Sequence, residues 1–148
     1  LYLVYVFSGM LFITDQFTKF LAREYLFDQS FVFGWLRFDL VFNTGAAYGL
    51  FSNFTPFLTW LGVIVIAYLL YSIKSLIHTK LDIVAYALII AGALGNTVDR
   101  ILFGKVTDFI NIQIIPVFNF ADIYLNIGVV LILLNTFFYA KKSTRNNG

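Results

Sequence analysis

The sequence predicts an all-α membrane protein with four transmembrane helices and a small extracytoplasmic β-sheet after the first helix. Only 12% of the 148 residues are charged, whereas soluble domains carry about 25%, and 60% are hydrophobic. Long stretches without any charged residue alternate with polar motifs, and two short segments alternate apolar and polar residues. The length suits one bundle, so we expect a single membrane-embedded domain over residues 1–148.

The charge-free stretches comprise residues 1–14, 41–73, 83–98 and 123–140. A spanning helix needs about 20 mostly apolar residues, so the second and fourth stretches are long enough alone. The helix of the second stretch is expected to begin near Pro56, since proline fits a first helical turn. The first and third reach spanning length only if the polar motifs at their ends enter the membrane boundary. No small-residue cleavage site follows the first stretch, so we expect a retained helix there.

Basic residues near the helix ends predict the orientation in the membrane. They occur in the loop between the second and third helices and in the C-terminal tail, at Lys74, Lys80, Lys141, Lys142 and Arg145. Four helices place this loop, this tail and the N-terminus on one side, which we predict to be cytoplasmic. The net charge of +2 is too small to indicate nucleic-acid binding.

Residues 36–42, "LRFDLVF", and residues 110–114, "INIQI", alternate apolar and polar side chains. Period-two alternation is typical of half-buried strands, so we expect a small sheet resting on the outer end of the bundle. Amphipathic aromatic rings favour the membrane interface. The candidates for such positions are Trp35, Trp60, Tyr25 and Tyr48.

The scarcity of nucleophiles and metal ligands narrows the chemistry. The absence of cysteine excludes disulfides, thiolate metal sites and cysteine nucleophiles. The single histidine, His78, is expected to be a solvated loop residue. A Ser-Lys pair at Ser72, Lys74 and Ser75 would lie on the cytoplasmic side and is disfavoured. Carboxylates at the outer face could hold a hard cation, but nearby basic residues would repel it, so we expect no metal and no cofactor.

Four polar clusters lie at the ends of the apolar stretches: "DQFTK" (15–19), "FNTGAAYG" (42–49), "GNTVDR" with "GKVTDF" (95–109), and "FNFAD" (118–122). An unpaired charge inside a membrane costs on the order of 3 kcal/mol by insertion scales, so ionisable residues there are functional candidates. The predicted topology brings all four clusters to the outer face.

Helical spacing divides the third cluster. Residues three and four apart are neighbours on a helix, so Asn96, Asp99 and Arg100 share a face. Asp99 is then expected to form an ion pair with Arg100, which suits structure or substrate positioning. Asp108 is expected on the turn that leaves this helix, and Asp122 opens the fourth helix. These last two carboxylates could approach each other across the connection.

Two carboxylates in one poorly hydrated site cannot both ionise at low cost, so one holds a proton while the other stays charged. The ionised group can then take a proton from water, and the protonated one can polarise a carbonyl. An alternative is a small proton-coupled transporter that uses the same aspartates as a relay. A relay needs ionisable groups at several depths, whereas the second helix is charge-free and the fourth carries only Asn126 and Asn135 beyond its start. A scaffold without catalysis would leave the aspartates with few opposing cations.

In order and spacing, "DQFTK", "FNTGAAYGLF", "AGALGNTVDRILFGKVTDF" and "FNFAD" resemble the motifs of the bacterial lipoprotein signal peptidases, or signal peptidase II. The resemblance covers nearly the whole chain. It implies a four-helix, inner-membrane aspartic endopeptidase that removes signal peptides from diacylglyceryl-modified prolipoproteins, cutting before the lipidated cysteine. The partners that it implies are these substrates and membrane lipids, and we expect the protein to act as a monomer.

The resemblance implies that Asp108 and Asp122 form the catalytic pair. The residues that it implies for substrate binding or support of the pair are Asp15, Asn43, Asn96, Asp99, Arg100 and Asn119. Two departures from the family pattern stand out. The connection between the two catalytic positions is short, and Ala91 replaces a usual glycine. Ala91 and Gly95 still form a pair of small residues, which predicts a close helix approach unless it only reflects the tolerance of membrane helices for glycine.

Overall fold

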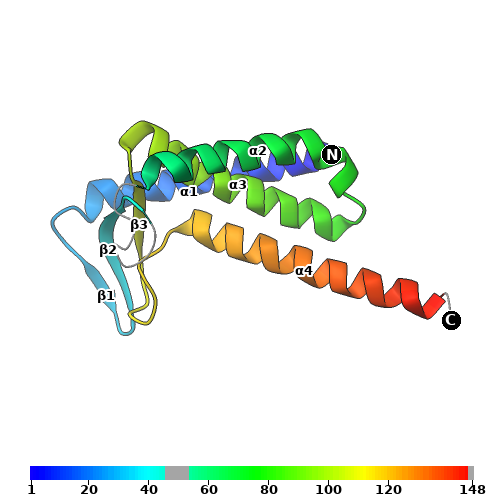
Figure 1. Cartoon of the computed structure of the whole chain (residues 1–148). Coiled ribbons are helices and arrows are strands. Elements are labelled where there is room, and N and C mark those ends of the chain that lie inside the picture. The colour runs from blue at the N-terminus through cyan, green and yellow to red at the C-terminus, as the bar shows by residue number, and fades with distance from the viewer. Residues whose placement is uncertain (46–53, 147–148) are drawn as a thin grey trace.

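Four helices and a three-stranded sheet make up the computed structural model, which describes residues 1–45 and 54–146, with side chains to residue 138. The helices are α1 (Tyr2–Tyr25), α2 (Thr55–Leu76), α3 (Lys80–Phe103) and α4 (Phe120–Asn146). The strands are β1 (Phe31–Phe33), β2 (Leu36–Asn43) and β3 (Val106–Asn111). Both termini lie at one end of the molecule and the sheet lies at the other (Figure 1). Tyr48 and the side chains of Lys141, Lys142 and Arg145 fall outside the described part.

Helix α3 is the central helix, because it packs against α1, α2, α4 and β3. Half of the apolar, membrane-length segment of α3 is buried within the protein, against 17% of the corresponding segments of α2 and α4. Among the described residues, these three helices are long and apolar enough to cross a membrane. Helix α1 matches α3 in length, at 24 residues. It is not among the three candidate spans, because its second half carries charged side chains at Asp15, Lys19 and Arg23.

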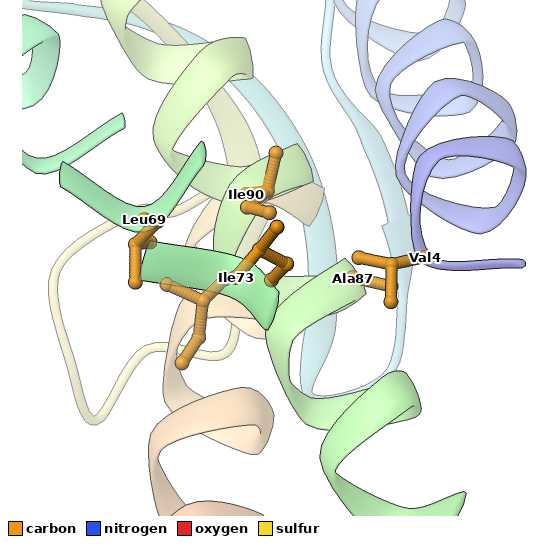
Figure 2. Packing of buried hydrophobic residues seen from close by; sticks show 6 residues of the cluster. Val4, Leu69, Ile73, Ala87 and Ile90 are labelled. Carbon is orange, nitrogen blue, oxygen red and sulfur yellow. The ribbon is translucent and has the colours of Figure 1, made fainter. Parts of the chain in front are cut away.

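One apolar cluster holds α1, α2 and α3 together at the end away from the sheet. Figure 2 shows Val4 of α1, Leu69 and Ile73 of α2, and Ala87 and Ile90 of α3 within this cluster. The exposed faces of the same helices are also apolar, as is expected of a surface that contacts lipid.

Small residues let α1 and α4 approach α3 closely near the other end. A methyl group at Gly95 would overlap the Asp15 carboxylate of α1 and would lie 3.1 Å from the Ala121 methyl of α4. A methyl group at Gly92 would lie 2.5 Å from the backbone oxygen of Ala121. The predicted close approach at Gly95 is therefore confirmed, and it brings Asp15 to the first turn of α4.

The sheet is antiparallel, with the order β1-β2-β3. Gly34 turns the chain between β1 and β2 with a φ of 63°, which favours glycine. The strand predicted at 36–42 is confirmed within β2. The strand predicted at 110–114 is wrong beyond residue 111, and β3 begins earlier, at Val106. Gln113 has a φ of 66° and donates its backbone N–H to Asn111 Oδ1, so the chain turns there instead of continuing as a strand.

Helix α2 begins at Thr55 with Pro56 in its first turn, as predicted. Helix α3 begins with a reciprocal cap. Thr79 Oγ1 accepts the Asp82 N–H at 3.2 Å, and Asp82 Oδ2 accepts the Thr79 N–H at 2.8 Å. His78 is exposed in the loop before this cap, as expected of a solvated loop residue.

Trp35, Trp60 and Tyr25 are exposed, at 72%, 68% and 61%. This exposure leaves their rings free to meet lipid or water. Their location at a membrane interface stays a prediction.

Candidate active site

Helix α4 begins with a reciprocal cap formed by Asn119 and Asp122. The Asp122 N–H donates to Asn119 Oδ1 at 3.0 Å, and the Asn119 N–H donates to Asp122 Oδ2 at 3.2 Å. Such a cap satisfies backbone donors that lack partners in a first helical turn. Asp15 joins it, because its Oδ1 accepts the Ala121 N–H at 2.9 Å. The cap fixes Asp122 in the first turn of α4, where a negative charge is favoured by the helix dipole.

Asp108 lies within strand β3, so the prediction that it lies on a turn is wrong. Gly104 ends α3 in a left-handed conformation, and the chain enters the strand two residues later. The sheet register pairs Asp108 with Val41. Asn43 lies two residues further along β2 and therefore on the same face. Its Nδ2 donates to Asp108 Oδ2 at 3.1 Å.

The amide of Asn119 connects the two aspartates. Its Nδ2 donates to Asp108 Oδ1 at 2.6 Å, while its backbone and Oδ1 bond to Asp122. Asn96 of α3 completes the network, since its Nδ2 donates to Asp122 Oδ1 at 2.8 Å. Asn119 is fully buried and Asp108 is 2% exposed, whereas Asp122 is only half-buried. The pair is therefore more open to its surroundings at Asp122 than at Asp108.

Electrostatics also link the two carboxyl groups. Burial, together with the negative charge of Asp122, raises the pKa of Asp108 to about 7. Hydrogen bonds from Asn43 and Asn119 and the charge of Lys19 act in the opposite direction but do not cancel the effect of burial. Near neutral pH, Asp108 thus readily holds a proton beside a second carboxyl group, which is the state that a shared-proton pair requires.

A buried ionic cluster adjoins the pair. Lys19 Nζ lies 3.0 Å from Asp15 Oδ2 and 3.8 Å from Asp99 Oδ2, and all three side chains are fully buried. Arg23 Nη1 lies 3.8 Å from Asp99 Oδ1. The expected ion pair between Asp99 and Arg100 is therefore wrong. Successive helical residues point about 100° apart, so Asp99 faces α1 while Arg100 does not.

Asp99 also connects α3 to the strand that carries Asp108. Its Oδ2 accepts the Thr107 N–H at 2.8 Å, and Arg23 Nη1 donates to Thr107 Oγ1 at 2.8 Å. These bonds fix the residue next to Asp108. The Asp99 carboxylate is therefore occupied by a backbone N–H and by two cations, so it is not a member of the aspartate pair.

Arg100 lies on the side of the aspartate pair. It is half-buried, and its guanidinium interacts electrostatically with Asp122 and Asp108 as well as with Asp99. Its Nη1 lies 3.5 Å from the backbone oxygen of Asn96. Arg100 therefore supplies positive charge close to the pair without a direct ion pair to either member among the described residues.

The structure brings together all eight residues that the sequence predicted for the site. Sequence reasoning placed Lys19 and Thr107 within polar clusters but gave neither of them a role in the site. Lys19 lies four residues after Asp15, which places both on one helix face, and this spacing could have indicated the pair. Nothing in the sequence indicates that Thr107 connects Asp99 to Arg23. Within the part of the chain that the structure describes, no three histidine, aspartate or glutamate side chains are grouped as for a metal ion.

Fold and site together define a helical membrane protein with a connected pair of aspartates at the sheet end of its bundle. A model of the family described as signal peptidase (SPase) II matches residues 7–138. A lipoprotein signal peptidase of Microcystis aeruginosa is 37% identical over 133 residues, which are 84% of this chain and 85% of that protein. One from Acinetobacter baumannii is 34% identical and covers 95% of this chain and 86% of its own.

A solved structure of a bacterial membrane enzyme superposes with a TM-score of 0.83 at 35% identity. The match covers 98% of this chain and 91% of that one. The chain therefore belongs to the signal peptidase II family. Members of this family are aspartic proteases, so the protein is a peptidase.

Proposed function

We propose that this protein cleaves signal peptides from diacylglyceryl-modified prolipoproteins just before the lipidated cysteine, with Asp108 and Asp122 as the catalytic pair. The names of its curated relatives support lipoprotein precursors as the substrate class. The observation that carries the assignment of the pair is the single asparagine, Asn119, that holds both carboxyl groups. Asp99 is the weaker candidate, because its oxygens are occupied by Lys19, Arg23 and the Thr107 N–H.

The proposed reaction begins with a water molecule between the two carboxyl groups. Asp122 takes a proton from this water while the oxygen attacks the scissile carbonyl carbon. The proton on Asp108 is shared with the carbonyl oxygen, so that the developing negative charge is neutralised. When the C–N bond breaks, a proton passes from the pair to the leaving amine. The signal peptide leaves as a carboxylate and the lipidated cysteine gains a free amino group.

The surrounding residues have supporting roles in this proposal. Asn43, Asn96 and Asn119 orient the two carboxyl groups through their amides. Arg100 provides positive charge for the substrate backbone or for the pair. Asp15 and Asp99 belong to the ionic cluster that joins α1, α3, β3 and the first turn of α4.

We further propose that all four helices span the membrane as one peptidase domain, with the termini in the cytoplasm and the pair near the extracytoplasmic face. The common end of the two termini supports an even number of crossings (Figure 1). The dependence of the site on residues from α1, β2, α3, β3 and α4 supports a single domain. The lipid on the substrate would keep the scissile bond close to the bilayer, and the protein would act as a monomer.

The test is incubation of purified protein with a diacylglyceryl-modified prolipoprotein, followed by mass measurement of the products. We expect one cut, before the lipidated cysteine. Asp108→Asn and Asp122→Asn should each lower its rate by about 10²–10⁴-fold while the protein still inserts. Asp99→Asn is the comparison variant, because Asp99 is the weaker candidate for a catalytic carboxylate. Normal cleavage by Asp108→Asn would reject the assignment, and release of peptide at any other bond would reject the substrate class.

A further inference from the structure

Lys19 is a buried cation near the aspartate pair, and the proposed reaction gives it no role. It is fully buried in α1. A lysine ammonium carries three donors, and three acceptors surround this one. Asp15 Oδ2 and Asn96 Oδ1 each lie 3.0 Å from Nζ, and Asp99 Oδ2 lies at 3.8 Å. Only one of these partners, Asn96, also contacts the aspartate pair directly.

The contact with Lys19 determines which way the Asn96 amide faces. An asparagine side chain has one acceptor oxygen and one donor nitrogen. Lys19 Nζ and Asn119 Nδ2 both donate to Asn96 Oδ1, the second at 3.1 Å. The Asn96 Nδ2 group is then left facing Asp122 Oδ1, to which it donates at 2.8 Å. A flipped amide would set its nitrogen against the ammonium and its oxygen against the carboxylate, so Lys19 opposes that state.

A purely structural role explains this arrangement less well. Buried ion pairs contribute little net stability, because desolvation offsets the attraction between the charges. Asp15 already has the Ala121 N–H and Gln16 Nε2 as donors, and Asp99 has the Thr107 N–H and Arg23. Asn96 Oδ1 has one other donor, the neutral amide of Asn119, so Lys19 is its only charged donor among the described residues.

We propose that Lys19 is a positioning residue of the catalytic pair, acting through Asn96 to hold Asp122 in place. The proposal rests on the proposed function, since it presumes that Asp122 reacts. Lys19 also influences Asp108, whose pKa its positive charge lowers. The other charged groups around Asp108 are Asp122 of α4 and Arg100 of α3, and its amide partners are Asn43 of β2 and Asn119.

The test compares Lys19→Met, which keeps the length of the side chain but removes its donors, with the same change at the exposed Lys74 at the far end of α2. We expect Lys19→Met to lower kcat by about tenfold to a hundredfold, the range for residues that orient metal ligands, with KM unchanged. The alkaline limb of the pH–rate profile should move to higher pH. Lys74→Met should match the wild type in all three quantities.

Lys19→Met leaves two buried carboxylates with fewer donors and could fail to fold. The double variant Asp15→Asn/Lys19→Met removes both charges of the pair and keeps an acceptor for the Ala121 N–H. It should fold and show the same loss of kcat, with a smaller shift of the limb, because the negative charge of Asp15 is removed together with the positive charge of Lys19. A double variant with wild-type kcat would overturn the proposal. If Asp108→Asn or Asp122→Asn cleaves normally, the proposed function fails instead, whatever Lys19 does.

Discussion

Helices α3 and α4 begin with the same local motif. Each has a polar N-cap residue and an aspartate three positions later, Thr79 with Asp82 and Asn119 with Asp122. In both, the aspartate N–H donates to the N-cap side chain and the N-cap N–H donates to the aspartate. In both, a further asparagine on a neighbouring helix donates to the remaining carboxylate oxygen. The cap alone therefore does not make a catalytic site.

The difference lies in what the N-cap side chain can still do. The Thr79 hydroxyl has a single oxygen, which accepts the helix N–H and Asn135 Nδ2. Asn119 caps with its oxygen and keeps an amide nitrogen, which reaches Asp108 at 2.6 Å. A second carboxyl group is thereby held beside the first, and its pKa rises. We infer that the N-terminal cap of α3 is structural, whereas the N-terminal cap of α4 is part of the catalytic site.

The largest expected effect distinguishes Asp122, in the cap of α4, from Asp82, in the cap of α3. Asp122→Asn should lower the cleavage rate by about 10²–10⁴-fold, the usual contribution of a general acid or base. Asp82→Asn should leave kcat within about twofold, because Asp82 lies at the opposite end of α3 from the pair. Steady-state cleavage of a lipidated prolipoprotein measures both. Equal losses in the two variants would refute the division, and would favour a relay that uses both ends of the bundle.

A smaller effect is expected when the cap of α4 is made like that of α3. Asn119→Thr keeps a capping oxygen but removes the amide that holds Asp108. Asparagine and threonine caps differ by only a few tenths of a kcal/mol, so the melting temperature should change little through the cap itself. The cleavage rate should fall by roughly tenfold to a hundredfold, as for other supporting residues. The converse change, Thr79→Asn, should leave activity unaltered. Full activity in Asn119→Thr would contradict the connecting role of the amide.

The pH dependence tests the same pair without changing its residues. Because the proposed reaction needs a proton on Asp108, the cleavage rate should fall as pH rises through about 7, the pKa of this group. The free energy of unfolding should also depend on the protonation of Asp108. Asp108 has a pKa near 3.8 when unfolded and about 7 when folded, so between these values only the folded state binds the proton.

The free energy of unfolding should therefore decrease as pH rises from about 4 to about 7, and this contribution should be constant above that range. Melting curves in detergent measure it, and Asp108→Asn is the control in which the slope should shrink. A slope of the same size in that variant would assign the titration to another group. A cleavage rate that does not change between pH 6 and 8 would reject Asp108 as the proton donor.

The sequence predicted the helices and the grouping of the site because hydropathy and polar spacing act locally. Long apolar stretches marked α2, α3 and α4, and the polar clusters at their ends converge as the topology required. The position of Asp108 on a strand could not be predicted in this way. The sequence "KVTDF" becomes a strand because β2 pairs with it, and this partner is more than sixty residues away.

The ion-pair partners of Asp99 were missed for a related reason. Local spacing suggested Arg100, the next residue. The actual partners, Lys19 and Arg23, come from α1, and they reach Asp99 because glycine at position 95 lets α1 and α3 pack closely. Contacts of this kind depend on how two helices face each other, which the sequence of either helix does not determine.

The smallest expected effect concerns the cap at α3 by itself. Thr79→Ala removes the hydroxyl that accepts the Asp82 N–H and Asn135 Nδ2, so one donor of the first turn loses its partner. Loss of such a cap costs about 1 kcal/mol, which should lower the melting temperature by a few degrees. Because the aspartate pair lies at the other end of the helix, kcat and its pH profile should stay at wild-type values. A changed pH profile in Thr79→Ala would show that the two caps are coupled through α3, and the contrast between a structural and a catalytic cap would then fail.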